Sequence, residues 1–144
     1  MKKKYLELNQ NERDWVEKNL TAVKGIVQST LGADDPDWLR PKNLDVAYKT
    51  WYSNHQRGSE DPNPLINAFG IAFGEYLIDN LDLRWILVKE KRTTEIALHG
   101  EPGEILLFPP NLVAKRYQEG ITDFFEPLSL EIEKQIKEVR QMHE

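Results

Sequence analysis

The sequence lacks cysteine, and it lacks any long apolar run. Without cysteine the chain can have no disulfide framework, no thiol nucleophile and no cysteine-ligated zinc or iron–sulfur site. This absence agrees with a reducing compartment. Polar residues follow the basic start at residues 2–4, where a signal peptide would have its apolar segment. No stretch approaches the ~18 apolar residues of a membrane span. We therefore expect a cytoplasmic protein with no membrane partner.

The sequence also lacks a strong excess of charge of either sign. Its 144 residues carry 19 basic and 24 acidic side chains, for a formal net charge of −5. Nucleic-acid binding requires a basic face, and dense basic clusters occur only at residues 2–4 and 89–92, so we expect no nucleic-acid partner. Hydrophobic residues make up 40% of the chain, enough for one core without a metal or disulfide. We predict a single domain over residues 1–144.

Helical periodicity dominates both ends of the chain and strand-like alternation its middle. We predict helices over residues 12–31, 44–56, 62–80 and 111–119, and a last helix from about residue 127. Residues 83–89, 94–99 and 105–108 are predicted strands joined by short turns. Consecutive strands between helical blocks favour an α+β fold. We expect N-terminal helices packed on a small three-stranded antiparallel meander, followed by two C-terminal helices.

The third predicted helix is apolar nearly all round, which places it at the centre of the domain. Gly70 and Gly74 each cost about 1 kcal/mol relative to alanine in a helix interior. Because they are four residues apart, they lie on one face. The pair predicts that a strand or another helix approaches this face closely.

Signatures of catalysis and of metal binding are missing. His55, His99 and His143 are scattered along the chain. His99 could share a metal with Glu101 or Glu104, but a third ligand is not visible, so we predict no metal site. Gly-x-Ser-x-Gly and the glycine-rich phosphate motifs are absent as well. We therefore expect no cofactor and no catalytic residue, which favours a non-catalytic protein.

An aromatic group at the end of the second predicted helix is the best candidate for binding. Tryptophan, tyrosine and arginine are the residue types that most often anchor protein interfaces. Our leading hypothesis is a protein-binding module, by analogy an immunity-like or regulatory protein. The candidate binding residues are Trp51, Tyr52, His55 and Arg57.

The main alternative is a small-molecule-binding domain or hydrolase with a polar pocket beside the sheet. Glu75 and Asp79 are four apart on the third predicted helix, and paired carboxylates in a cleft can divide acid and base roles. His99 and Arg116 would complete this pocket if all four side chains converge. A third possibility is a homo-oligomer that uses the first or last helix as its seam. The sequence does not determine the oligomeric state.

Short motifs in the second half of the chain carry a resemblance to a known family. They are Phe69-Gly70-x-x-Phe73-Gly74-Glu75, Leu83-Arg84-Trp85, Phe108-Pro109, and Lys115-Arg116 with Gly120. Over residues 67–139 the sequence resembles DUF3806, a bacterial family of domains of unknown function. The resemblance implies a compact bacterial domain in which a glycine-containing helix packs on a small sheet. It transfers no catalytic residue, and residues 1–60 lie outside it.

Overall fold

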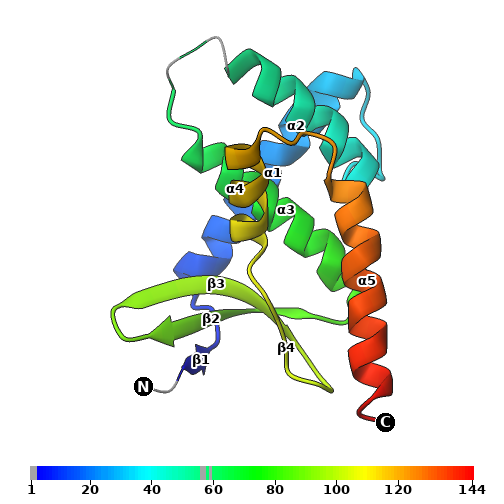
Figure 1. Ribbon diagram of the computed structural model, residues 1–144. Coiled ribbons are helices and arrows are strands. Elements are labelled where there is room, and N and C mark those ends of the chain that lie inside the picture. The colour runs from blue at the N-terminus through cyan, green and yellow to red at the C-terminus, as the bar shows by residue number, and fades with distance from the viewer. Residues whose placement is uncertain (1–2, 56–57, 59) are drawn as a thin grey trace.

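The computed structural model describes residues 3–55, 58 and 60–144. Figure 1 shows helices gathered above a small antiparallel sheet, with α5 running down beside the sheet. No helix of the described residues is long and apolar enough to cross a membrane. In chain order the elements are β1 (Lys4–Leu6), α1 (Gln10–Leu31), α2 (Pro41–His55), α3 (Asn63–Leu81), β2 (Arg84–Glu90), β3 (Thr93–Gly100), β4 (Ile105–Leu107), α4 (Pro109–Glu119) and α5 (Phe125–Gln141).

The sheet has four strands in the order β1-β2-β3-β4, all antiparallel to their neighbours. The meander formed by β2, β3 and β4 confirms the predicted α+β fold, but the predicted strand number was wrong by one. The missed strand is β1, in which Tyr5 lies opposite Val88 of β2. Three residues are too few to show a period-two pattern, and the partner strand lies far away in the sequence. Only tertiary pairing makes this segment a strand.

Four of the five helices start two or three residues earlier than predicted, and α3 starts one residue later. Asn9 caps α1: its side chain accepts the Glu12 backbone N–H at 2.9 Å, and the Glu12 carboxylate accepts the Asn9 N–H at 2.6 Å. The α2 helix begins at Pro41, because proline suits the first helical position. Asn43, in the first turn of α2, donates to the Asp37 carbonyl at 2.9 Å.

The glycines of α3 are closely approached, as predicted. A Cβ atom on Gly70 would lie 2.5 Å from the Pro110 Cα atom at the start of α4. One on Gly74 would lie 2.2 Å from the Trp85 ring of β2. Neither distance is sterically possible, so both positions require glycine in this packing. The start of α4 and the Trp85 side chain of β2 thus pack against this one face of α3.

The main core lies where α2, α3 and α5 meet. Tyr48, Phe69 and Phe125 are fully buried there. The face of the sheet that carries Leu98 contributes to this core. On the opposite face, Ile86 joins a separate small cluster with Val88, Ala97, Leu106 and Phe108.

A buried carboxylate joins α2 to the start of α5. Asp45 of α2 accepts the backbone N–H groups of Phe124 at 2.9 Å, Phe125 at 2.7 Å and Glu126 at 3.1 Å. These amides have no partner within α5, because they belong to its first turn. Burial raises the pKa of Asp45, and the three amide donors oppose that rise. The cap fixes α5 against α2 from far away in the sequence.

Candidate functional site

An aromatic cluster joins the C-terminal half of α2 to α4. The Trp51 ring stacks on His55, with centroids 5.2 Å apart and planes inclined by 18°. The Tyr117 ring of α4 lies 5.6 Å from that of Tyr52 and 6.0 Å from that of Trp51. All four side chains are half-buried. The structure thus brings together three of the four predicted binding residues, while Arg57 lies outside the described residues.

Tyr48 connects this cluster to the core. Its ring centroid lies 5.5 Å from that of Trp51 and 5.3 Å from that of Phe69. Its buried hydroxyl has no hydrogen-bond partner among the described residues, and burial raises its pKa well above the usual value. Tyr48 thus packs against Trp51, which is itself half-buried. Trp51 therefore contacts the core and also reaches the surface.

Trp51 lines a hollow between α1 and α2. Its volume is about 410 Å³, and none of its lining residues is charged. In a chain of which 30% is charged, this is an unusual stretch of surface. Depletion of charge around an aromatic residue is typical of the centre of a protein interface. The lining residues are Ala22, Gly25, Ile26, Ser29, Thr30, Thr50, Trp51 and Asn54.

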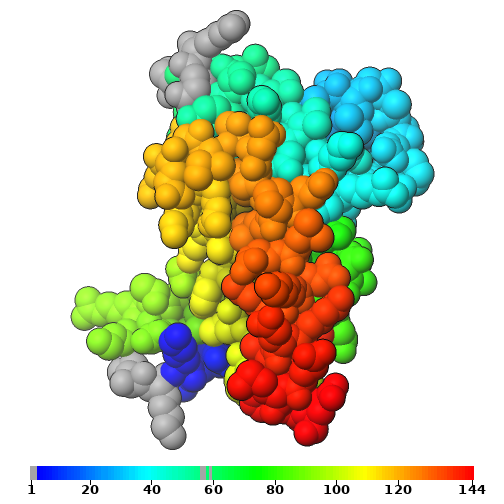
Figure 2. Space-filling model, turned by 45° about the vertical axis from the view of Figure 1, so that its right-hand side comes forward, coloured from blue at the N-terminus to red at the C-terminus, as the bar shows by residue number. Residues whose placement is uncertain are grey.

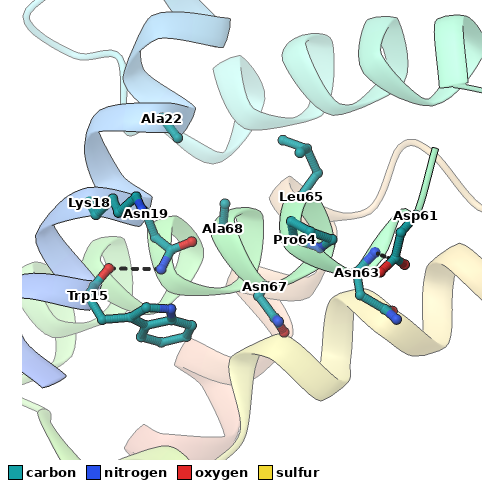
Figure 3. A pocket seen from close by; sticks show the side chains of 10 residues that line it. All are labelled: Trp15, Lys18, Asn19, Ala22, Asp61, Asn63, Pro64, Leu65, Asn67 and Ala68. Carbon is teal, nitrogen blue, oxygen red and sulfur yellow. Dashed lines mark hydrogen bonds between the residues drawn. The ribbon is translucent and has the colours of Figure 1, made fainter.

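A second hollow continues along α1 toward the start of α3. Figure 3 shows Trp15 and Ala22 on α1 facing Leu65 and Ala68 on α3. Ala22 lines both hollows, which are therefore neighbours along α1, and together we call them the α1 groove. From Trp15 to Ser29 its α1 wall is about 21 Å long, at 1.5 Å per residue. Two charged residues, Lys18 and Asp61, line the second hollow, and none lines the first.

Gly25 lies within the α1 wall of this groove. The residue is exposed, and a Cβ atom placed on it would meet no atom within 4 Å. Within a helix, glycine costs about 1 kcal/mol relative to alanine. No contact among the described residues requires glycine here, unlike at Gly70 or Gly74. The backbone of α1 is therefore open to close approach by another molecule.

The carboxylates predicted for a pocket beside the sheet lie on the other half of α3. Glu75 accepts a hydrogen bond from the Trp85 indole at 3.1 Å. Burial raises the pKa of Glu75, the Trp85 hydrogen bond opposes the rise, and the nearby charges of Asp79 and Glu17 add to it. Asp79 is exposed and lines a hollow of about 490 Å³ with Tyr76 and residues 36–40.

The two other predicted pocket residues lie elsewhere. His99, near the end of β3, lines a different hollow with Arg84 and Glu101. Arg116 directs its guanidinium to the Leu112 carbonyl of its own helix, at 3.3 Å. The structure therefore brings Glu75 close to Asp79, but it does not bring these two together with His99 and Arg116 around one cavity.

One group of side chains could hold a metal ion. Over the described residues, the donor atoms of His99, Glu101 and Glu104 all lie within 4.8 Å of one another. The sequence suggested His99 with one of these acids as two ligands. Because the turn after β3 folds back, both acids are present at the same histidine.

The α1 wall of the groove was missed by sequence reasoning. In the sequence Trp15, Ala22 and Ile26 lie beside Val16 and Val23, so the helical pattern alone does not separate a groove face from the core face. The structure divides them: Val16 and Val23 are buried, whereas Trp15 is 40% exposed. The signal that could have separated the two faces was Gly25. A glycine inside a continuous helix usually has a packing or functional reason, so its position indicates a face distinct from the core face.

Comparisons with known proteins add a fold and a family. A crystal structure from Bacteroides thetaiotaomicron VPI-5482 is similar to this chain, with a TM-score of 0.70 and 12% sequence identity. The match covers 90% of this chain and 47% of that one, so the chain spans about half the length of its structural relative. At this identity the likeness concerns the fold alone. No curated protein matches the chain.

The family match agrees with the resemblance found in the sequence, but it covers a different range of residues. Residues 48–126 match the domain of unknown function DUF3806, which is more than half of the chain. The match begins at Tyr48, earlier than the predicted residue 67, and so includes the aromatic cluster of α2. It leaves α1 outside. The chain belongs to the DUF3806 family of domains of unknown function.

Proposed function

We propose that this chain is a non-catalytic protein-binding module and that its partner docks in the α1 groove. The observation that carries the proposal is the uncharged hollow between α1 and α2. It combines Trp51, whose ring packs on Tyr48, with an exposed backbone at Gly25. Buried tryptophans surrounded by uncharged residues are typical anchors of protein interfaces. The predicted binding residue Trp51 is kept in this proposal, and Gly25 is added to it.

The shape of the groove favours a helical occupant. One wall is α1, and the other is formed by the end of α2 and the start of α3. A length of about 21 Å accommodates roughly fourteen residues of helix. An amphipathic helix would place its apolar side chains beside Trp51 and Leu65, and small residues such as Ala22 and Gly25 would let its backbone approach α1 closely. We therefore infer that the partner contributes an amphipathic helix.

The polar-pocket alternative has less support. A ligand-binding or hydrolytic pocket requires its polar groups to converge on one cavity. Glu75 hydrogen-bonds to Trp85, His99 lines another hollow, and Arg116 bonds to its own helix. The Asp45 cap between α2 and α5 supports the further expectation that residues 1–144 act as one domain.

The test introduces a charge into the groove without harming the fold. Gly25→Glu adds one negative charge where space is open. Lys24→Gln changes the net charge by the same one unit, at an exposed position of α1 that does not line the groove. Tagged wild-type and variant chains are used to capture partners from lysate of the native host. The captured protein is then purified and titrated by calorimetry.

We expect Gly25→Glu to weaken partner binding at least about tenfold, because a carboxylate in an apolar interface loses its hydration. Lys24→Gln should bind within about twofold of wild type, as rim and remote charges contribute little. A photoreactive group at Ser29 should cross-link to a helical segment of the partner. Equal binding by both variants, or capture of no protein, would contradict the proposal.

A further inference from the structure

The turn that follows β3 brings three metal-ligand side chains together. His99 lies near the end of β3, and Glu101 and Glu104 lie on either side of the tight turn at Pro102 and Gly103. In Figure 2 this yellow part of the chain lies between the blue N-terminal strand and the red α5 helix. The donor atoms of the three side chains all lie within 4.8 Å of one another. This site is separate from the α1 groove, since none of its residues lines that groove.

His99 supplies an independent indication that the site takes a ligand. Its side chain is only 4% exposed, and its buried Nε2 atom has no hydrogen-bond partner among the described residues. Nε2 points at Glu104, whose Oε2 atom lies 3.6 Å away, beyond hydrogen-bond distance. A buried polar atom without a partner costs free energy. The imidazole is therefore directed toward the two carboxylates and left unsatisfied there.

The geometry points to a binding site for a divalent first-row transition metal ion, with His99, Glu101 and Glu104 as its ligands. One imidazole and two carboxylates are donors that zinc, cobalt and manganese accept, whereas magnesium and calcium prefer oxygen donors alone. Glu101 and Glu104 are exposed and can move inward by the small distance that coordination requires. Three protein ligands leave at least one coordination position open to water or to a further ligand.

Some residues around the site favour binding of a metal ion, and one opposes it. The Tyr5 ring packs on the His99 imidazole, with centroids 5.3 Å apart, and restricts its rotation. Gly103 of the turn packs closely against Val139 of α5, which fixes the turn. Arg84 lines the same hollow as His99 and opposes a cation. The site therefore selects ions that bind nitrogen and oxygen donors tightly, zinc above manganese.

Direct metal titration tests this inference and does not depend on any protein partner. Untagged full-length chain is titrated with Zn²⁺ by calorimetry, and far-ultraviolet circular dichroism confirms that each variant is folded. We expect one ion per chain. Glu104→Gln and Glu101→Gln should each weaken binding at least about tenfold, because each removes a charged ligand. Both positions are exposed, so neither substitution should unfold the chain.

Two matched controls make the result specific. Glu95→Gln removes an exposed acid of β3 outside the group, and His143→Gln removes an exposed histidine near Gly103. Both should bind Zn²⁺ within about twofold of wild type. In nitrogen-detected spectra Zn²⁺ should shift the His99 ring resonances and leave those of His143 unchanged. Absence of Zn²⁺ binding, equal affinity in Glu104→Gln, or loss of binding in His143→Gln would overturn the inference.

Discussion

Two helices of this chain contain interior glycines, and the surroundings of these glycines are opposite. In α3, Gly70 and Gly74 are buried, and any added Cβ atom would collide with Pro110 or Trp85. In α1, Gly25 is exposed, and an added Cβ atom would meet nothing. The glycines of α3 are therefore explained by packing inside the chain. No contact among the described residues explains the glycine of α1, and the proposed partner would dock on this face.

The largest effect is expected from Gly70→Ala. The nearest atoms to the new Cβ belong to the backbone of Pro110, which cannot rotate away as a side chain could. We expect the free energy of unfolding to fall by about 3 kcal/mol, despite the better helix propensity of alanine. Urea denaturation measures this change. A loss below about 1 kcal/mol would mean that α3 and α4 are less tightly packed than described.

A smaller effect, of opposite sign, is expected from Gly25→Ala. Alanine in the open helix position should raise the free energy of unfolding by about 1 kcal/mol, because it reduces the conformational freedom of the unfolded chain. The same denaturation experiment applies, with Gly70→Ala as the contrasting variant. If Gly25→Ala instead destabilises the chain, Gly25 has an internal role and the contrast between the two helices fails.

The smallest effect concerns Glu75, whose partner Trp85 fills the space beside Gly74. Burial raises the pKa of Glu75, so the folded chain holds this proton more tightly than the unfolded chain does. The resulting stabilisation is fully present below the pKa that Glu75 has in the unfolded chain. It is lost as pH rises through the pKa that Glu75 has in the folded chain. Glutamine keeps an acceptor for Trp85 and carries no charge. Relative to Glu75→Gln, the wild type should therefore lose stability between about pH 4 and neutral pH.

Thermal unfolding of both proteins at a series of pH values provides the measurement. Asp79→Asn serves as a control, because Asp79 is exposed and accepts no hydrogen bond from Trp85. Its difference from wild type should vary less with pH. A difference between wild type and Glu75→Gln that does not change with pH would show that Glu75 is as well solvated in the fold as in the unfolded chain.

Local patterns in the sequence predicted the features that depend on neighbouring residues. Gly32 and Gly120 end α1 and α4 in left-handed conformation, as their positions after apolar stripes indicated. Gly70 and Gly74 predicted a close contact, because the free-energy cost of glycine in a helix interior must be offset by packing. The identity of the contacting atoms, in Pro110 and Trp85, could not be predicted. It depends on how segments that are not adjacent in the chain pack together.

The same distinction applies to the candidate sites. Trp51 could be selected by residue type, but the groove beside it depends on how α1 packs on α2 and α3. The sequence around Asp45 does not indicate that it is a helix cap, because the amides that it binds lie about eighty residues later. His99, Glu101 and Glu104 are close in sequence, but only the folded turn brings both carboxylates near the imidazole. Tertiary geometry, not residue type, decided each of these cases.

The sheet ends on both sides in a strand of only three residues, β1 and β4. Each of them covers only part of its longer neighbour: β1 pairs with residues 87–89 of β2, and β4 pairs with residues 98–100 of β3. Among the described residues, the outer edge of β3 over residues 93–97 therefore has no strand partner. A free edge of this kind can accept a strand from another molecule, so the sheet as well as the helices offers a surface for association.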